Sequence, residues 1–310
     1  MGEDTRLTDT VRDLLESGRR ERLSQILEDA HAADIAAALR ELPLADQVTL
    51  FRLLGRESAG AVLAELGDQA VHELASALDE GEISSILDRM RPDDAAQVIE
   101  ELPAEQAEKV LDLMKEEKSE EVQELLEYGE KTAGRLMTPD MLAVLEDLTV
   151  AQAVEQVRKS PVAETAPILY VVDDHDHLVG SLPWRRLVTA DPTAPVGLLR
   201  QEEPVSVTPE TDQEEVARLV AKYNLVALPV VDSGHRLLGV ITVDDVIDVI
   251  REEATEDIQR LGGAAGDETV LDPARVVFPK RLVWLLINLG TAILAASVMI
   301  PARRAWPFQR

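Results

Sequence analysis

Cysteine is absent from this chain of 310 residues, which excludes disulfide bonds, thiolate metal sites and cysteine nucleophiles. Aromatic residues make up only 3% of the chain, whereas hydrophobic residues make up 45%. This apolar set consists mainly of alanine, leucine, valine and isoleucine, which favours short, closely packed helices over an aromatic-rich β-sandwich. The length allows two or three domains, each with a core of its own.

Positive charge is also scarce: 31 lysine and arginine residues face 59 acidic ones, and the formal net charge is −28. Nucleic-acid binding needs clustered lysine and arginine, so we predict no nucleic-acid partner. The acidity has two explanations. It keeps a protein soluble, or some of the carboxylates hold hard cations such as Mg²⁺ or Ca²⁺, which prefer oxygen ligands.

Several functional signals are missing as well. The first fifteen residues are charged and lack the apolar stretch of a signal peptide, which predicts a cytosolic N-terminus. The sequence contains no phosphate-binding loop, no HExxH pattern and no recognisable Ser/His/Asp set. We therefore predict that the protein is not an enzyme.

Apolar residues recur every twelve positions in the first part of the chain. One register comprises Leu42, Leu54, Leu66, Leu78, Met90, Leu102, Met114 and Leu126, and a second comprises Leu50, Val62, Leu74, Ile86, Val98, Val110 and Val122. Turn-forming residues such as Pro43, Gly55 and Gly67 follow members of the first register. Each unit predicts one short helix and a tight turn, and helices this short bury their apolar stripes only by stacking. We predict an all-α superhelical solenoid over residues 1–130.

The next part of the chain contains an internal duplication. Tyr170–Asp173 and Leu178–Gly180 recur 59 residues later as Pro229–Asp232 and Leu237–Gly239, and Thr149, Glu155 and Val157 match Thr208, Glu214 and Val216 at the same offset. Each copy reads as a helix, an apolar strand, a short turn, a second apolar strand and a helix. This pattern predicts two equivalent α/β modules.

These modules resemble a tandem pair of CBS domains, over residues 131–194 and 195–250. The resemblance rests on Leu136-Met137-Thr138-Pro139 and on Gly239-Val240-Ile241-Thr242-Val243-Asp244-Asp245. It implies Thr242 and Asp245 as nucleotide-binding residues, with ATP as the candidate ligand. In the first copy Arg186 replaces the acid, so the resemblance implies binding at one site rather than at both. CBS pairs commonly associate side by side, which implies a homodimer.

The run Asp173–His177 has the composition of a transition-metal site. It lies between two predicted strands, however, where the second copy has Asp232–Arg236. A polar hairpin turn accounts for both copies, and this is our interpretation.

An acidic helix is predicted over residues 243–263, where Gly262-Gly263 signals its end. At 100° per residue, Asp245, Asp248, Glu252 and Glu256 fall within a sector of about 80°. Val246, Ile247, Val249 and Ile250 form a different, apolar face. Two unit charges about 5 Å apart repel by roughly 3 kcal/mol at an effective dielectric constant near 20. The stripe is therefore either a solvated surface or, opposite other acids, a surface that needs bound cations.

The segment from Leu282 to Ile300 holds nineteen residues without a formal charge. As a helix it is about 28 Å long, close to the hydrocarbon thickness of a bilayer. Trp284 and the preceding Lys280-Arg281 suit a membrane interface. We predict a transmembrane helix over residues 282–300, with the lipid bilayer as a partner and residues 1–280 on the cytoplasmic side of the cell membrane.

The order of a helical solenoid, a CBS pair, an acidic helix and a membrane span resembles the MgtE family of magnesium transporters. Local matches are Arg135–Thr138, Glu253–Ile258 and Trp284–Leu289. The resemblance implies the cytosolic Mg²⁺-sensing and gating region of such a protein, up to its first membrane helix. Residues 301–310 form an atypical tail unlike the family's continuation, so we expect a C-terminally truncated chain that does not conduct ions by itself.

The resemblance also implies a set of magnesium ligands, because the family places Mg²⁺ between the solenoid, the CBS pair and the connecting helix. Carried over residue by residue, the ligands are Glu57, Asp93, Glu214, Asp245, Asp248, Glu253, Glu256 and Asp257. Acids such as Glu57 and Asp93 in a first helical turn are also ordinary partners of the helix dipole. Two expected acids are replaced by Gln97 and Asn224, whose amide oxygens carry no charge.

The implied mechanism is electrostatic. Mg²⁺ bridges acidic residues and holds the closed state, and loss of Mg²⁺ lets the carboxylates repel one another and frees the connecting helix. An alternative remains: a membrane-tethered sensor and scaffold that binds adenine nucleotides through its CBS pair. The sequence leaves open whether ATP binds and how Mg²⁺ is distinguished from Co²⁺.

Overall fold

The computed structural model describes residues 4–164, 166–202 and 204–261, and beyond them only residues 282, 285–287, 289–291 and 293–294. The chain divides into two units, Met1–Val243 and Asp244–Arg310. The first unit contains a helical region followed by an α/β region, as the sequence predicts.

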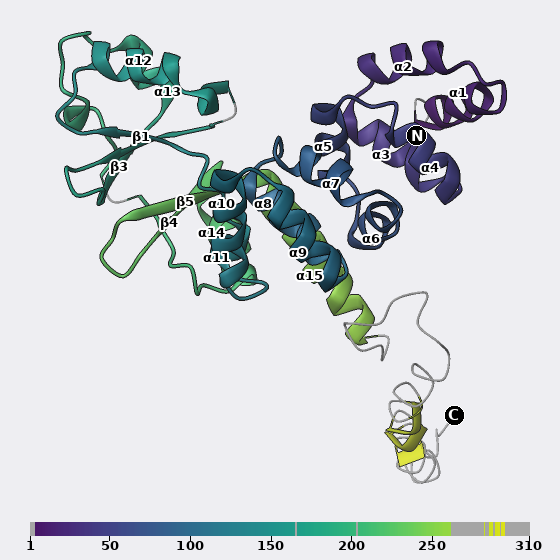
Figure 1. Cartoon of the computed structure of the whole chain (residues 1–310). Coiled ribbons are helices and arrows are strands. Elements are labelled where there is room, and N and C mark those ends of the chain that lie inside the picture. The colour runs from purple at the N-terminus through teal and green to yellow at the C-terminus, as the bar shows by residue number, and fades with distance from the viewer. Residues whose placement is uncertain are drawn as a thin grey trace, which may run out of the picture. The chain divides into compact units, whose positions relative to one another are not determined.

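Ten short helices make up the helical region (Figure 1). They are α1 (Asp4–Glu16), α2 (Arg20–Asp29), α3 (Ala32–Arg40), α4 (Leu44–Phe51), α5 (Arg56–Ala64), α6 (Asp68–Ser76), α7 (Glu80–Leu87), α8 (Pro92–Glu100), α9 (Ala104–Leu113) and α10 (Glu116–Glu127). Helix α2 packs on α1, and the other helices pack mainly on the next but one: α1, α3, α5, α7 and α9 form one row, and α4, α6, α8 and α10 form the other. This confirms the predicted stack of short helices.

The twelve-residue repeat corresponds to one helix per unit from α4 onwards. Every member of the register that begins at Leu50 is buried. Members of the register that begins at Leu42 follow the helices, except Leu126, which lies in the last turn of α10. All of them are buried except Leu54 and Leu126, which are half-buried. One register therefore fills the core between the two rows, and the other closes the turns.

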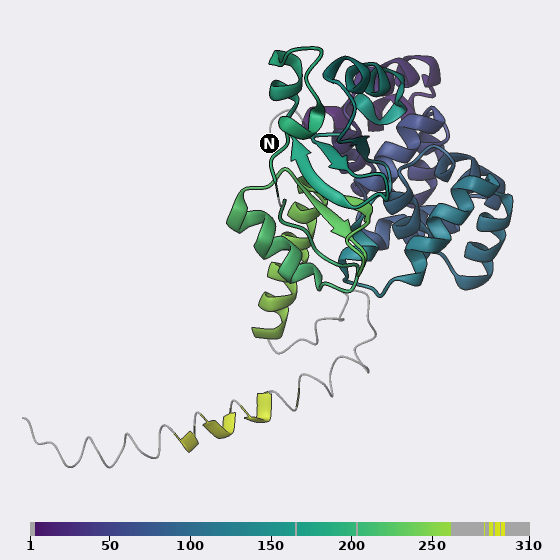
Figure 2. The same cartoon turned by 90° about the vertical axis from the view of Figure 1, so that its left-hand side faces the viewer.

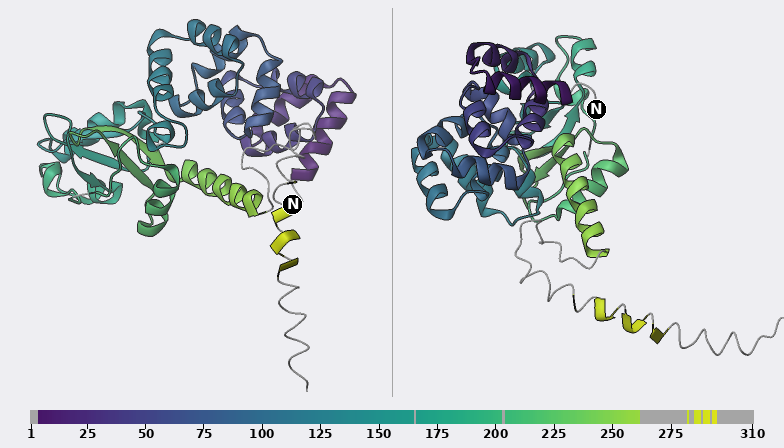
Figure 3. Two further views of the ribbon diagram at one scale, coloured as in Figure 1. Left: turned by 90° about the horizontal axis from the view of Figure 1, so that it is seen from below. Right: turned by 90° about the vertical axis from the view of Figure 1, so that its right-hand side faces the viewer.

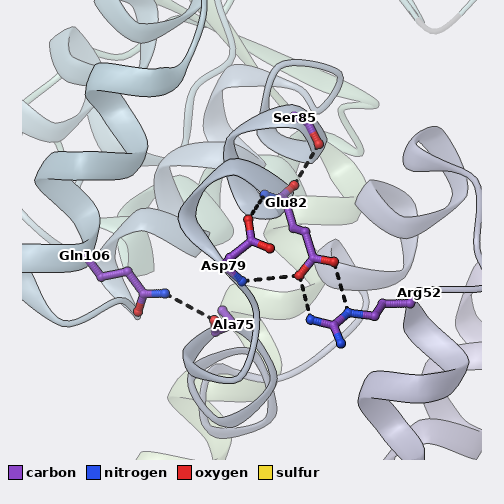
Figure 4. Close-up of polar contacts among 6 residues, drawn as sticks. All are labelled: Arg52, Ala75, Asp79, Glu82, Ser85 and Gln106. Atoms are coloured by element: carbon purple, nitrogen blue, oxygen red, sulfur yellow. Dashed lines mark hydrogen bonds and ion pairs between the residues drawn. The ribbon is translucent and has the colours of Figure 1, made fainter.

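Polar contacts at helix ends tie neighbouring helices together (Figure 4). Helix α7 begins with a capping box, in which the Asp79 carboxylate accepts from the Glu82 amide at 2.8 Å and the Glu82 carboxylate accepts from the Asp79 amide at 3.2 Å. Arg52, just after α4, donates two hydrogen bonds of 3.0 and 2.9 Å to the same Glu82 carboxylate. Gln106 of α9 donates to the Ala75 carbonyl at the end of α6. Helix caps and inter-helix contacts thus share side chains.

The α/β region contains two small sheets (Figure 2). Its elements are α11 (Ala133–Leu136), β1 (Leu142–Leu145), α12 (Val150–Lys159), β2 (Leu169–Val172), β3 (Leu178–Leu182), α13 (Trp184–Thr189), α14 (Gln213–Tyr223), β4 (Ala227–Val231) and β5 (Leu237–Thr242). Strand β2 pairs in parallel with β1 and antiparallel with β3, and β4 pairs antiparallel with β5. Tyr170 and Val172 of β2 share one apolar cluster with Ala227 and Val231 of β4, so the two copies have a common core.

The duplication is real, but its offset differs between strands and helices. Gly180 and Gly239 keep the offset of 59 residues, and a Cβ atom on either glycine would lie 2.8 Å from a backbone carbonyl oxygen, of Gln201 or Thr138. The predicted match of Thr149 with Thr208 is wrong. Thr149 caps α12, whereas the matching cap of α14 is Asp212, 63 residues later. A short 3-10 helix, Pro161–Glu164, lengthens the first copy between helix and strand and accounts for the difference.

The two hairpin turns have the same design, which confirms the interpretation of Asp173–His177. The Asp173 carboxylate accepts from the amides of His175 and His177, both at 2.9 Å. Asp232 accepts from the amides of Gly234 and Arg236, both at 2.8 Å. The second copy therefore builds the turn without the histidine and aspartate run of the first.

Helix α15 (Val243–Leu261) is continuous and makes up most of the described part of the second unit (Figure 3). The predicted connecting helix ends at residue 263, and its last two residues lie outside the described part. Among the described residues, no helix has the length and apolar character needed to cross a membrane. The span predicted over residues 282–300 lies largely outside the described residues, and the tail 301–310 lies wholly outside them.

Candidate functional site

The acidic stripe on α15 lies on one unbroken helix, as the sequence predicts. Asp248 is exposed and forms an ion pair with Arg251 at 3.3 Å. Asp245, Glu253 and Glu256 are half-buried, whereas the side chain of Asp257 lies outside what the structure describes. The stripe therefore combines exposed carboxylates with partly desolvated ones.

The apolar face of α15 is narrower than the sequence predicts. Val246 and Val249 are buried, but Ile247 and Ile250 are 50% and 45% exposed. Val246 and Val249 are three residues apart and lie on one side of the helix, whereas Ile247 points about 100° away from Val246. Only part of the apolar face is therefore buried.

Glu57 and Glu214 occupy the first turns of α5 and α14, and both are exposed. Acids at these positions interact favourably with the helix dipole. In the described part of the chain, Glu57, Glu214, Asp248, Glu253 and Glu256 belong to no group of three or more metal-ligating side chains whose atoms lie within 4.8 Å of one another. The structure therefore does not bring these predicted ligands together.

Asp93 differs from the other predicted ligands because it is buried, with only 8% of its surface exposed. The Arg91 guanidinium forms an ion pair with its carboxylate and lies 3.8 Å from the carboxylate of Asp94. No pattern in the sequence indicated a role for Arg91, although it stands two residues before Asp93. The guanidinium supplies this pair of acids with positive charge from within the protein.

The two amides found where acids were expected have different surroundings. Gln97 is exposed on α8. Asn224 ends α14 in a left-handed conformation with φ of 49°. Its backbone N–H, and not its side-chain amide, donates to the carbonyl of Val220. Asparagine adopts this conformation more readily than most residues, so its presence here has a backbone reason.

A cavity of about 40 Å³ lies where the helical region meets the α/β region. Thr138 and Asp140 line it from the segment before β1, Tyr170 from β2 and Thr242 from β5. The remaining polar lining residue is Arg91 of the solenoid. The structure thus places the predicted nucleotide residue Thr242 in a cavity. Asp245, its predicted companion, lies in the first turn of α15.

Tyr170 is the notable residue of this cavity. Its side chain is 2% exposed, and its hydroxyl has no hydrogen-bond partner in the described part of the chain. Burial raises the pKa of the phenol, so the group is neutral at physiological pH. A buried hydroxyl without a partner costs free energy and indicates that water or a ligand group completes the site.

The surroundings of Gly180 in the first copy differ from those of the matching Gly239 in the second copy. Arg200 packs against Gly180 and forms an ion pair with Glu146, whereas Met137 packs against Gly239. Arg186, which replaces the nucleotide-binding acid, donates to the Leu199 carbonyl at 3.2 Å. The two halves therefore differ in charge, and the single nucleotide site stays a prediction.

Asp173, Asp174 and His175 are the remaining candidate for metal ligation, since their ligand atoms lie within 4.8 Å of one another. The Asp173 carboxylate already holds the hairpin turn, and the His175 ring is hydrogen-bonded to the Asp174 carboxylate. The hydrogen bond from the His177 ring and the amides of the turn lower the pKa of Asp173 to about 2. The cluster is explained by its structural role.

The comparisons with known proteins agree with this architecture. Residues 30–131 match the MgtE intracellular N domain, and residues 133–193 and 198–252 match the CBS domain. The chain is 43% identical over 175 residues to a magnesium transporter MgtE of Thermus thermophilus and 35% identical over 175 residues to one of Bacillus subtilis. Each alignment covers 56% of this chain and 39% of the relative, so the chain aligns with about two fifths of the length of these relatives.

Two solved structures are similar over most of the described chain. A crystal structure of the cytosolic domain of the Mg²⁺ channel MgtE in complex with ATP aligns with a TM-score of 0.74 at 36% identity, covering 78% of this chain and 99% of that one. The soluble part of a magnesium transporter aligns with a TM-score of 0.73 at 26% identity, covering 81% of this chain and 99% of that one.

Proposed function

Because this chain belongs to the MgtE family of magnesium transporters, we propose that residues 4–261 form a cytosolic region that senses Mg²⁺ and gates transport. The observation that carries this proposal is the match to nearly the whole of a solved cytosolic domain of an Mg²⁺ channel. The membrane helix over residues 282–300, the cytoplasmic placement of residues 1–280 and a homodimer through the CBS pair are parts of the same proposal.

The sensing mechanism that we propose uses the acidic side chains. Mg²⁺ takes oxygen ligands and keeps several of its waters, so it suits carboxylates that converge only partly. Bound Mg²⁺ bridges acidic residues and keeps the gate closed, and its loss restores their mutual repulsion. The proposed ligands are Glu57, Asp93, Glu214, Asp245, Asp248, Glu253, Glu256 and Asp257.

Limited proteolysis with trypsin, with and without millimolar Mg²⁺, tests this mechanism on the full chain. We expect Mg²⁺ to slow cleavage of the native protein. We expect a smaller effect in the triple variant Asp248→Asn, Glu253→Gln, Glu256→Gln, which removes three charges from α15. The matched control removes three exposed acids from α9 and α10: Glu105→Gln, Glu108→Gln and Glu120→Gln. Equal cleavage of the native protein in both conditions contradicts the mechanism.

A specific observation favours a second function, the binding of an adenine nucleotide. Thr242 and Tyr170 line the cavity, the buried hydroxyl of Tyr170 has no hydrogen-bond partner in the described part of the chain, and a similar cytosolic domain is known in complex with ATP. We propose that this cavity holds the nucleoside part of the ligand. Calorimetric titration with ATP and with adenosine at constant Mg²⁺ tests the proposal, and the absence of binding by either ligand contradicts it.

A further inference from the structure

Arg91 has an unusual position in the nucleotide cavity. It belongs to the turn between α7 and α8 of the solenoid, whereas the other lining residues come from the CBS pair. Its side chain is 30% exposed, so it lies at the rim rather than in the interior. A ligand in this cavity therefore meets two domains.

The charges of the cavity are also divided between the domains. The CBS pair contributes a carboxylate, Asp140, together with the hydroxyls of Tyr170 and Thr242. The positive charge comes from Arg91. Hydroxyl and carboxylate groups suit the neutral, hydrogen-bonding part of a nucleoside, whereas a planar guanidinium suits a phosphate, which it binds through two parallel hydrogen bonds.

We propose that Arg91 binds the phosphate groups of an adenine nucleotide, so that the ligand links the solenoid to the CBS pair. This inference rests on the nucleotide-binding function proposed above. The phosphates exchange with Asp93 and Asp94 as partners of the guanidinium. The cavity of about 40 Å³ has room for about three water molecules. A nucleotide therefore fits only when the rim opens, and Arg91 is the rim residue that the solenoid supplies.

The test compares a charged ligand with an uncharged one. We would titrate ATP, ADP and adenosine into the full chain and into Arg91→Ala, Arg91→Lys and Arg89→Ala at constant Mg²⁺. Arg89 is the matched control because it is exposed in the same turn and does not line the cavity. We expect Arg91→Ala to weaken ATP and ADP by about tenfold or more and to leave adenosine unchanged. Arg91→Lys falls between, and Arg89→Ala matches the native protein.

The possible failures can be told apart. If the native protein binds neither ATP nor adenosine, the nucleotide-binding function is wrong and the role of Arg91 falls with it. If the native protein binds both but Arg91→Ala leaves the ratio of their affinities unchanged, the role of Arg91 alone is wrong. Thermal unfolding of each variant without ligand shows whether it is folded. If Arg91→Ala is unfolded, Arg91→Lys decides: an unchanged ratio overturns the inference.

Discussion

The guanidinium of Arg135 on α11 lies 2.7 Å from the carboxylate of Glu100 on α8. The same guanidinium donates to the carbonyl of Ala96 at 3.1 Å. The Arg135 side chain is only 7% exposed. One buried arginine at the start of the CBS pair thus contacts α8 of the solenoid at two points, the side chain of Glu100 and the backbone carbonyl of Ala96.

We expect Arg135→Ala to destabilise the protein by about 2–4 kcal/mol, because removing one partner of a buried ion pair leaves the other without compensation. Chemical denaturation of the full chain measures the change. The control is Arg158→Ala, which removes an exposed ion pair with Glu155 and should change stability by less than about 1 kcal/mol. Equal effects of the two substitutions would show that Arg135 does not connect the domains energetically.

A substitution at Asp93, which forms an ion pair with Arg91, distinguishes a structural role of this carboxylate from a role in sensing Mg²⁺. In the absence of Mg²⁺, we expect Asp93→Asn to lower the free energy of unfolding by about 1–2 kcal/mol, because Asp93 is buried and paired. Glu57→Gln, at an exposed first-turn position, should cost about 0.5 kcal/mol or less. Denaturation in a chelating buffer measures both. A stable Asp93→Asn variant would argue that Asp93 is kept for the cation alone.

Tyr170→Phe removes a buried hydroxyl that has no partner in the described part of the chain. We expect the free protein to keep its stability or gain about 1 kcal/mol, because no hydrogen bond is lost. Affinities for adenosine and ATP should fall together, because Tyr170 lines the cavity in which we propose that the nucleoside part binds. Tyr223→Phe, at a 47% exposed position, is the control. A marked loss of stability in Tyr170→Phe would reveal a structural partner for this hydroxyl.

The contact between Arg52 and Glu82 gives a pH-dependent contribution to stability. The hydrogen bonds from Arg52 hold the pKa of Glu82 below its ordinary value of 4.5. A lowered folded-state pKa means that the stabilisation is complete above that ordinary value and is lost as the pH falls through the depressed one. We expect the stability difference between the native protein and Glu82→Gln to be constant from pH 7 to about pH 5 and to shrink below that.

Denaturation midpoints between pH 3 and pH 7 measure this dependence. Glu108→Gln, an exposed substitution on α9, is the control, and it should stay close to the native protein throughout. A gap between the native protein and Glu82→Gln that widens towards acid would contradict the assignment.

Much of the fold could be predicted because the repeats are written in the sequence. The register that begins at Leu50 places one buried residue in each successive helix, so its spacing alone indicates one helix per unit. The strands of the CBS pair likewise keep a constant offset in sequence. Gly180 and Gly239 are equivalent in the structure too, because each lies close to a backbone carbonyl. The offset of the helices was not predictable, because the cap at Asp212 depends on where the preceding turn ends.

The candidate sites were predicted less completely. Residue types and helical spacing indicated the stripe of acids on α15, and Thr242 was found from its motif. Arg135 could not be assigned a role, because its partner Glu100 is brought near it only by the packing of α8. Arg91 stands close in sequence to its partners Asp93 and Asp94, but its place in the lining of the cavity depends on the tertiary structure. The sequence indicated an apolar face on α15, but not that Ile247 and Ile250 on this face are about half exposed.

The sequence by itself determined the kinds of module in this protein, their order and the helix that carries the acidic stripe. The spacing of apolar residues along the chain is a local property, and it determines which face of each short element is buried. Only the tertiary structure decided that Asp93 is buried beside Arg91 and that the distant Arg135 neutralises Glu100. Electrostatic energies depend on distance and burial, and these are fixed only when segments far apart in the chain come together.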